Sequence, residues 1–209
     1  MIRQLAVWFN AGGPFMWAIL SVLAVASAIA LERVIFYSII CRKRGYDLLK
    51  EIVPALEKGD IKAASAKVKR SSHPMYRLAN TILENHDLSK SKEQIQEALD
   101  EAAIVEMPRL PNRLNYLGLF ANISTLLGLL GTVVGLQLSF ASLASIEAAK
   151  KATMLAVGIS QAMNCTAFGL IVAISCMICY TILFNKQARL TKDLDQTIVR
   201  LMNHVKRRI

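Results

Sequence analysis

The sequence is poor in acidic residues, and charge of either sign is missing from long stretches of it. It has 15 Asp and Glu against 25 Lys and Arg, a formal net charge of +10. No charged residue or histidine occurs over Phe15–Leu31, Leu114–Ile146 or Ala152–Asn185. With 54% hydrophobic residues, this pattern excludes an ordinary soluble enzyme and a disordered chain, and it indicates a small polytopic membrane protein.

Other scarce residues exclude several kinds of chemistry. The three histidines lack ligand spacing and the four cysteines fall in or beside apolar runs, so we expect neither a metal site nor a disulfide framework. Paired Asp residues and a Ser/His dyad are absent from the apolar runs, which argues against an intramembrane hydrolase. We predict no cofactor and no enzyme activity. Basic and aromatic residues do not interleave, so nucleic acid is not an expected partner.

The apolar runs predict an all-α fold with three transmembrane helices, at residues 15–41, 114–146 and 152–185. About 20 apolar residues are enough for a helix to cross a bilayer. The second and third runs are longer than that, so both helices are expected to project beyond the bilayer into the cytoplasm. Strand alternation, flexible linkers and internal repeats are missing from the sequence, which favours one helical unit.

The distribution of basic residues predicts the topology. Residues 42–113 have 14 Lys and Arg against 11 Asp and Glu, and residues 186–209 have seven against two. Both segments are therefore expected in the cytoplasm. The N-terminus and the short turn at 147–151 then lie outside, on the other side of the membrane. Residues 1–14 form a predicted interfacial helix, and the basic tail at 186–209 is expected to contact anionic membrane lipids.

The cytoplasmic segment 42–113 is predicted to be helical in pieces. Lys58-Gly59-Asp60 marks a turn, and Pro108 and Pro111 interrupt the chain before the second span. At the end of the first apolar run, Glu32 and Arg33 are interpreted as interfacial anchors, with a role as ion carriers as the alternative.

Polar residues in the second and third spans form two matched layers. If the hairpin turns near Ala149, Thr132 and Thr166 are each 17 residues from the turn, and Gln137 and Gln161 are each 12. Small residues suit close helix packing, and the candidates are Gly128, Gly131, Gly135 and Gly169. Buried amide groups need polar partners. The candidates for such a polar face are Thr132, Thr166, Gln137, Gln161, Ser160 and Asn164. Helix packing and a polar pore face both remain open interpretations.

Four stretches resemble the MotA/TolQ/ExbB family, closest to its TolQ/ExbB branch. They are GLLGTVVG at 128–135, VGISQAMNCTAFGL at 157–170, GGPFMWAIL at 12–20 and LERV at 31–34. The resemblance covers nearly the whole chain, including the turn at Gly59-Asp60, and the spacing between the motifs also fits.

The resemblance implies a stator subunit of an ion-driven motor in the bacterial inner membrane, with its N-terminus in the periplasm. The branch that the chain resembles most uses protons. In the family, five copies surround two single-span partners of the ExbD/TolR type, whose transmembrane Asp carries the proton. Thr132 and Thr166 correspond to the family's two passage-lining threonines. Gln161 stands where the family usually has Glu, so sodium is the alternative ion. Thr125 and Ser175 stand where the family usually has Pro, which predicts straighter helices. A non-conducting membrane scaffold that recruits partners through its cytoplasmic helices is the alternative function.

Overall fold

The computed structural model describes residues 9, 12–40, 45–57, 61–69, 73–87, 91–143 and 147–206. Within these ranges the secondary structure is helical, and no strand occurs. Three helices are long and apolar enough to cross a membrane: α2 (Phe15–Ile40), α7 (Asn115–Ser142) and α8 (Ala148–Lys206). The predicted all-α class with three spans, two of them long, is confirmed.

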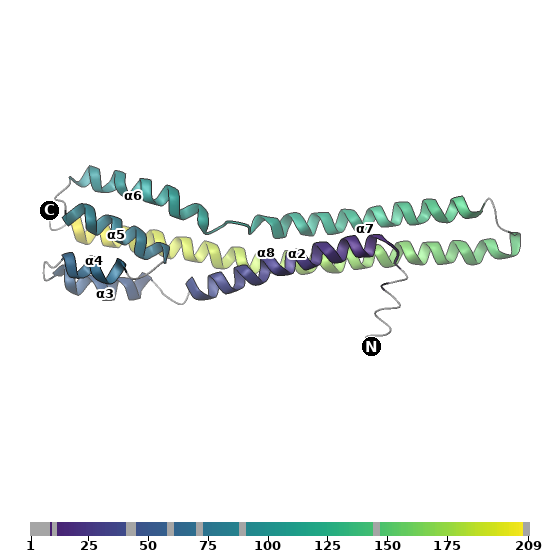
Figure 1. Ribbon diagram of the computed structural model, residues 1–209, viewed down its shortest axis with the longest axis horizontal. Helices are drawn as coiled ribbons and strands as arrows, with labels where there is room; N and C mark the ends of the chain where they lie inside the picture. The colour runs from purple at the N-terminus through teal and green to yellow at the C-terminus, as the bar shows by residue number, and fades with distance from the viewer. Residues whose placement is uncertain are drawn as a thin grey trace. The chain divides into compact units, whose positions relative to one another are not determined.

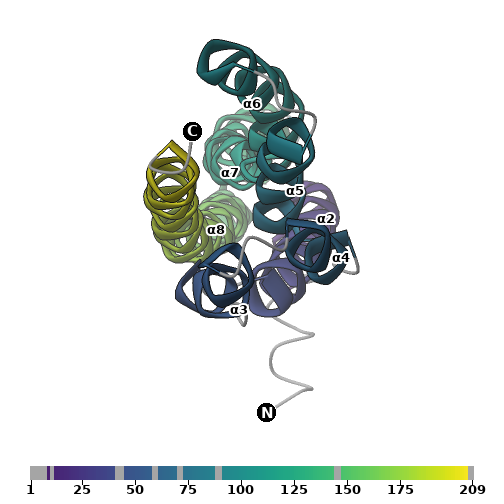
Figure 2. The same ribbon diagram turned by 90° about the vertical axis from the view of Figure 1, so that its left-hand side faces the viewer.

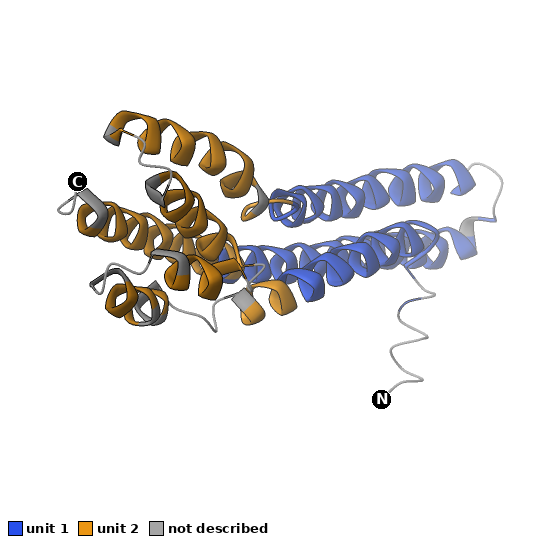
Figure 3. Ribbon diagram, turned by 60° about the vertical axis from the view of Figure 1, so that its left-hand side comes forward, with its two compact units in different colours: residues 1–33, 113–182 blue, residues 34–112, 183–209 orange. Residues whose placement is uncertain are grey.

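The chain divides into two compact units, coloured separately in Figure 3. The first contains residues 1–33 and 113–182, and the second contains residues 34–112 and 183–209. Helices α2 and α8 each contribute to both units. Residues 186–206, which the sequence analysis treated as a separate basic tail, continue α8 as an unbroken helix of 59 residues.

The first unit is built on a hairpin of α7 and α8, which lie side by side in Figure 1. Helix α2 also belongs largely to this unit, and residues just before it determine where it begins. Gly13 has a φ of +80°, a conformation that glycine adopts without strain, and Pro14 precedes the first helical residue. The Gly13 carbonyl accepts a hydrogen bond of 3.2 Å from the backbone N–H of Met16.

The second unit contains the short helices α3 (Gly45–Glu57), α4 (Ile61–Lys69), α5 (Pro74–Asp87) and α6 (Lys92–Glu106), followed by a 3-10 turn, η1 (Met107–Arg109). Helix α5 packs against both α4 and α6, and α3 packs against α4, as the end view in Figure 2 shows. Their apolar faces bury Leu48, Ile52, Leu78, Ile82, Leu83 and Ile95. Burial of such side chains is the main stabilising contribution in a small helical unit.

Polar contacts join the helices of the second unit at their rims. The Lys69 ammonium lies 2.8 Å from the Glu84 carboxylate, and this hydrogen-bonded contact lowers the pKa of Glu84. Both side chains are about half exposed, so solvent screening keeps the contribution of this pair small. The Tyr37 hydroxyl donates a buried hydrogen bond of 2.6 Å to the Leu110 carbonyl, which fixes the end of α2 against the segment after η1.

Helix α5 was not anticipated from the sequence, although its start has recognisable features. Pro74 occupies the first helical position, and the backbone N–H of Met75 donates to Nδ1 of His73 at 3.2 Å. Helix α6 begins with a complete capping box, in which Ser91 and Gln94 bond reciprocally to each other's backbone N–H groups.

Three of the expectations from the sequence fall outside the described residues. They are the interfacial helix over most of residues 1–14, the turn at 58–60, and the basic end of the tail at 207–209.

Candidate functional site

The site begins with the contact surface between α7 and α8, which we call the seam. Residues at alternating spacings of four and three form it, as in a coiled coil. On α7 they are Ala121, Ser124, Gly128, Gly131 and Gly135, and on α8 they are Gly158, Ala162, Cys165, Gly169 and Val172. A methyl group added to Gly169 would lie 2.7 Å from the Ser124 carbonyl oxygen and 3.0 Å from the Gly128 Cα. Small residues therefore allow the two backbones to approach closely.

The seam also fixes the register of the hairpin. Gly131 lies against Cys165, and Gly135 lies against Ala162. Each pair is nearly symmetric about residues 148 and 149, close to the turn centre assumed from the sequence. With a rise of 1.5 Å per residue, Thr132 and Thr166 are then within about 3 Å of one another in depth.

Helix α2 begins against one side of this hairpin. The side chain of Gln161 lies beside Gly13, and a methyl group added to Gly131 would lie 3.5 Å from the Cβ of Phe15. The rings of Phe9 and Phe168 meet edge to face, with centroids 5.6 Å apart. These contacts place the start of α2 on a single side of the seam.

Thr132 and Thr166 lie on the other side. Successive helical residues are rotated by about 100°, so a residue directly after a seam residue turns away to one flank. Thr132 follows Gly131, and Thr166 follows Cys165. Because the two helices are antiparallel, the rotation from the seam residue to the next residue points both threonines to the same flank. We call this flank, opposite α2, the threonine face. Both threonines are half-buried.

The two hydroxyl groups are held by backbone carbonyls. Oγ1 of Thr166 donates across the seam to the Gly128 carbonyl at 2.8 Å, and Oγ1 of Thr132 donates to the Leu129 carbonyl of its own helix at 2.6 Å. A hydroxyl that has donated its hydrogen still has oxygen lone pairs. The threonine face therefore offers acceptors to water, to a protonated acid or to a small cation.

The structure separates the other predicted polar residues from the threonines. Gln161, on α8, lies beside Gly13 at the start of α2, on the flank opposite the threonine face. Gln137 is exposed and comes nine residues, or two and a half turns, after Gly128, so it points away from the seam. Ser160 is exposed and Asn164 is half-buried. All four predicted packing glycines, in contrast, line the seam: Gly128, Gly131, Gly135 and Gly169.

Charged residues mark the end of the apolar band that lies farthest from the start of α2. The Arg113 guanidinium contacts both carboxylate oxygens of Glu32, at 3.0 and 3.2 Å, and Arg33 is buried beside them. Seventeen residues of α2 separate Phe15 from Glu32, which corresponds to about 26 Å of helix. This distance is close to the thickness of a hydrocarbon core. The threonine pair, level with Phe15, is therefore near the end of the band that is farthest from Glu32.

Two further polar residues on α7 were missed as site candidates. Asn122 and Thr125 precede Thr132 by ten and seven residues, and both are exposed. Each directly follows a seam residue, Ala121 or Ser124. Thr125 lies within about 20° of Thr132 around the helix, whereas Asn122 is rotated from Thr132 by about 80°. Leu129 and Leu136 follow the seam residues Gly128 and Gly135 in the same way, so the polar residues alternate with leucines and give no simple repeat in the sequence.

Replacing Gly13 with alanine is expected to disturb the junction between α2 and the hairpin. The new Cβ would overlap the Gln161 side chain at a backbone φ of +80°. A non-glycine residue in such a conformation costs about 1–3 kcal/mol. We expect a lower thermal unfolding temperature in detergent, with Gly118→Ala as the control, since no atom outside the helix backbone lies within 4 Å of the added methyl group there. An unchanged Gly13→Ala protein would contradict the described contact.

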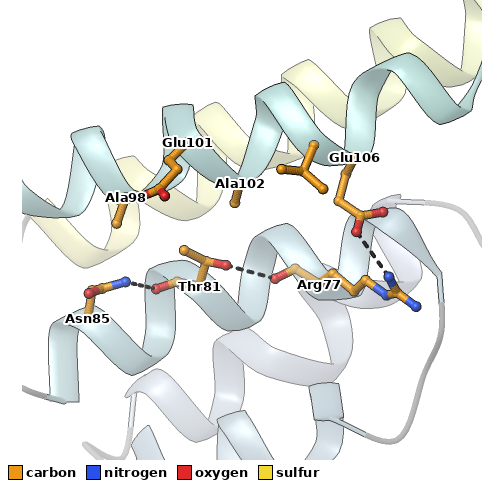
Figure 4. A pocket seen from close by; sticks show the side chains of 8 residues that line it. Arg77, Thr81, Asn85, Ala98, Glu101, Ala102 and Glu106 are labelled. Atoms are coloured by element: carbon orange, nitrogen blue, oxygen red, sulfur yellow. Dashed lines mark hydrogen bonds and ion pairs between the residues drawn. The ribbon is translucent and has the colours of Figure 1, made fainter.

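A cavity lies in the second unit, between α5 and α6. It has a volume of about 510 Å³, and Figure 4 shows its lining residues. At one end the Arg77 guanidinium is 3.0 Å from the Glu106 carboxylate, while Glu101 lies further along the same wall. Ile104 and Val105 are exposed on α6. The lining of the cavity combines positively and negatively charged groups with apolar side chains, a composition that is typical of surfaces that bind other proteins.

The fold and the site define a class: a membrane protein with three spans and a hydroxyl-bearing helical hairpin. Residues 70–196 match the model of the MotA/TolQ/ExbB proton channel family. The ExbB-like 3 biopolymer transport protein of Synechocystis sp. is 31% identical over 170 residues, which cover 80% of this chain and 79% of that protein. The chain belongs to the MotA/TolQ/ExbB family, which is described as a family of proton channels.

Two other relatives agree. The ExbB homolog of Methanothermobacter thermautotrophicus is 27% identical over 173 residues, or 83% of this chain and 60% of that protein. The Tol-Pal system protein TolQ of Haemophilus influenzae is 39% identical over 85 residues, or 40% of this chain and 36% of TolQ. The chain therefore spans about three fifths of the archaeal relative and a smaller part of TolQ.

Proposed function

We propose that this protein is the stator subunit of an ion-driven motor in the inner membrane, and that protons are the ions it passes. The observation that carries this proposal is the placement of Thr132 and Thr166 at similar depth on the flank opposite α2. Membership of a proton channel family supports it. Hydroxyl groups at this depth in apolar helices give a moving ion polar contacts that lipid cannot give.

The proton carrier has to come from a partner subunit. The apolar runs 15–31, 114–146 and 152–185 contain no carboxylate, and Glu32 lies at the charged end of the band, so this chain has no acid in the apolar part of its spans that could load and release a proton. We propose a single-span partner of the ExbD/TolR type, with an Asp in its helix, that lies inside a ring of five copies. Each unit charge moved through 100 mV supplies about 2.3 kcal/mol, enough to bias a rotation step.

The threonine hydroxyls suit both protonation states of such an Asp. While they donate to the Leu129 and Gly128 carbonyls, their lone pairs can accept a hydrogen bond from a protonated carboxyl group. When the carboxyl loses its proton, a hydroxyl that rotates away from its carbonyl can donate to the carboxylate instead. The internal hydrogen bond lost in this exchange is worth about 1 kcal/mol, less than a bond to a charged group.

The basic residues on 42–113 and 186–209 support a cytoplasmic location for the second unit, with the N-terminus and the hairpin turn outside. The Glu32–Arg113 pair then lies at the cytoplasmic boundary of the membrane, and the threonine pair lies nearer the periplasm.

The alternative is a non-conducting scaffold that recruits partners through its cytoplasmic helices. The cavity between α5 and α6, with Ile104 and Val105 exposed beside it, favours this function. In that case the polar face of the hairpin would serve only to bind neighbouring helices.

The oligomeric mass of the protein in mild detergent tests the proposal first. Native mass spectrometry is expected to find five copies of the 23.1 kDa chain, because the ring must close around a lumen. Ion flux into liposomes that contain the complex purified with its partner is the second readout. A stable monomer or dimer, or a pentamer whose complex conducts no ions, would favour the scaffold.

A further inference from the structure

The cavity between α5 and α6 is an open groove with walls that suit the packing of a third helix. Residues at helical intervals of three and four line it: Arg77, Thr81 and Asn85 on α5, and Ala98, Ala102 and Val105 on α6. Side chains at these intervals lie on one face of a helix. The two alanines leave space between the faces, and the volume of about 510 Å³ is in the range of binding pockets.

The groove has a net negative charge. Its lining contains two carboxylates, Glu101 and Glu106, and one guanidinium, that of Arg77. Arg77 is already bonded to Glu106 at 3.0 Å, which leaves the charge of Glu101 uncompensated within the groove. The Thr81 hydroxyl donates its hydrogen to the Arg77 carbonyl at 3.2 Å, as Figure 4 shows, and keeps its lone pairs as acceptors. The groove is therefore complementary to a helix with cationic and hydrogen-bond-donating side chains.

The end of α8 has such a face. Leu190 and Leu194 are buried in the second unit, and the opposite side of the helix is a line of exposed residues at alternating spacings of three and four. This line, which we call the outer stripe, consists of Arg189, Lys192, Gln196, Val199 and Asn203. Two of the five are cations, two are amides and none is acidic. Within the part of the chain that the structure describes, neither Lys192 nor Glu101 forms an ion pair.

The groove and the outer stripe lie at similar heights in the second unit, which contains both (Figure 3). The chain passes between the units at residues 112–113 and again at 182–183. By the register of the seam these two crossings are level, because they are almost equally far from the turn of the hairpin. Glu101 comes eleven residues before position 112, and Lys192 comes nine residues after position 183. Gln196 and Ala98 each lie about one turn further from the crossings.

We propose that the groove between α5 and α6 binds the outer stripe of a second copy of this chain, with Lys192 of one copy paired to Glu101 of the next. Rotation about the membrane normal keeps every residue at its height, so residues at similar heights meet between neighbours. A groove and a stripe on different elements make a heterologous contact, the kind that closes into rings. This inference rests on the proposed stator function, and it adds a contact surface and a named pair to it. It also assigns the groove to the ring, so the groove ceases to favour the scaffold.

Cysteine cross-linking tests the contact. Ala98→Cys and Gln196→Cys are introduced together where the four native cysteines have been replaced by alanine, and a short bismaleimide is added to the oligomer in mild detergent. Each copy then carries one thiol for each of its two neighbours, so we expect a denaturing gel to show a ladder from dimer to pentamer. Gln96→Cys with Gln196→Cys is the control and is expected to give no ladder. Gln96 is exposed and is rotated by about 200° from Ala98, away from the groove.

An exchange of charges tests the named pair. In the cross-linking variant, Glu101→Lys places two cations against each other and is expected to slow the formation of the ladder by at least about tenfold. Adding Lys192→Glu is expected to restore it. Asp100→Lys is the matched control, because Asp100 is exposed at the same height and does not line the groove.

Equal ladders from the two cysteine pairs, or no ladder from either, would overturn the contact, and a charge exchange that restores nothing would overturn the pair. If Ala98→Cys does not assemble as the wild type does, Ala102→Cys provides the same test one turn along the groove. A native mass of five copies without any ladder would reject the contact and retain the ring of the stator. A ladder to the pentamer in a complex that conducts no ions would retain the contact and reject the stator.

Discussion

The Thr132→Val, Thr166→Val double variant is expected to lose ion flux while the oligomer remains intact. Valine keeps the shape of threonine and removes the hydroxyl, so any ion or acid at this layer loses two polar contacts. A hydrogen bond to a charged group contributes about 1.5–3 kcal/mol, and 1.4 kcal/mol corresponds to a factor of ten. We therefore expect the flux into liposomes, followed with an entrapped pH-sensitive dye, to decrease by at least about tenfold.

Thr181→Val is the matched control for this experiment. The Thr181 hydroxyl donates to the Met177 carbonyl at 2.9 Å, so the substitution removes the same kind of internal bond from an exposed position. It lies 15 residues after Thr166, or about 22 Å further along α8. Full flux in the double variant, with its oligomeric mass unchanged, would show that neither threonine hydroxyl is needed in the ion pathway.

The two single variants separate assembly from conduction. The Thr166 hydroxyl bonds across the seam to Gly128, whereas the Thr132 hydroxyl bonds within its own helix. Valine at 166 therefore removes a contact between helices as well as a polar group, while valine at 132 removes only the polar group. A flux defect in the Thr132 variant alone is the cleaner sign of a role in conduction.

The sequence predicted the parts of the fold that hydropathy controls. Long runs without charge specify spans regardless of tertiary contacts, since an unpaired charge in hydrocarbon is costly. The register of the hairpin followed from symmetry about its turn, because two antiparallel helices joined by a short connection pair residues at equal distance from it. The contact of Gly131 with Cys165 agrees with a turn near Ala149 to within about one residue.

Rotation about the helix axis could not be predicted in the same way. In an apolar span every face of the helix is hydrophobic, so hydropathy does not show which face packs against the neighbouring helix. Gln137 and Gln161 match in depth but point to different flanks, because one lies two and a half turns after Gly128 and the other contacts the start of α2. Only the positions of small residues in the seam, together with the contacts of α2, identify the threonine face. The short helix α5 was missed for a different reason, since its start depends on a histidine acceptor.

Gly169→Ala is expected to destabilise the hairpin. The atoms within reach of the new methyl group are backbone: the Ser124 carbonyl oxygen at 2.7 Å, then the Gly128 Cα at 3.0 Å and N at 3.3 Å. A flexible side chain could move aside, but here α7 as a whole would have to move away from α8. Overpacking of this kind typically costs about 1–3 kcal/mol, and the displacement would also lengthen the hydrogen bond from Thr166 to Gly128.

Gly118→Ala is again the matched control, because both substitutions replace a helical glycine by alanine and gain about 1 kcal/mol of helix propensity. At Gly118 no atom opposes the methyl group, so the control is expected to unfold at the same temperature as the wild type or slightly higher. Thermal unfolding of the purified oligomer in detergent separates the two variants. Equal unfolding temperatures would mean that α7 and α8 do not approach closely at Gly169, and the threonine face, whose direction depends on that seam, would lose its basis. A lower unfolding temperature in the Gly169 variant alone would establish the close approach of α7 and α8 at the seam without any measurement of ion flux.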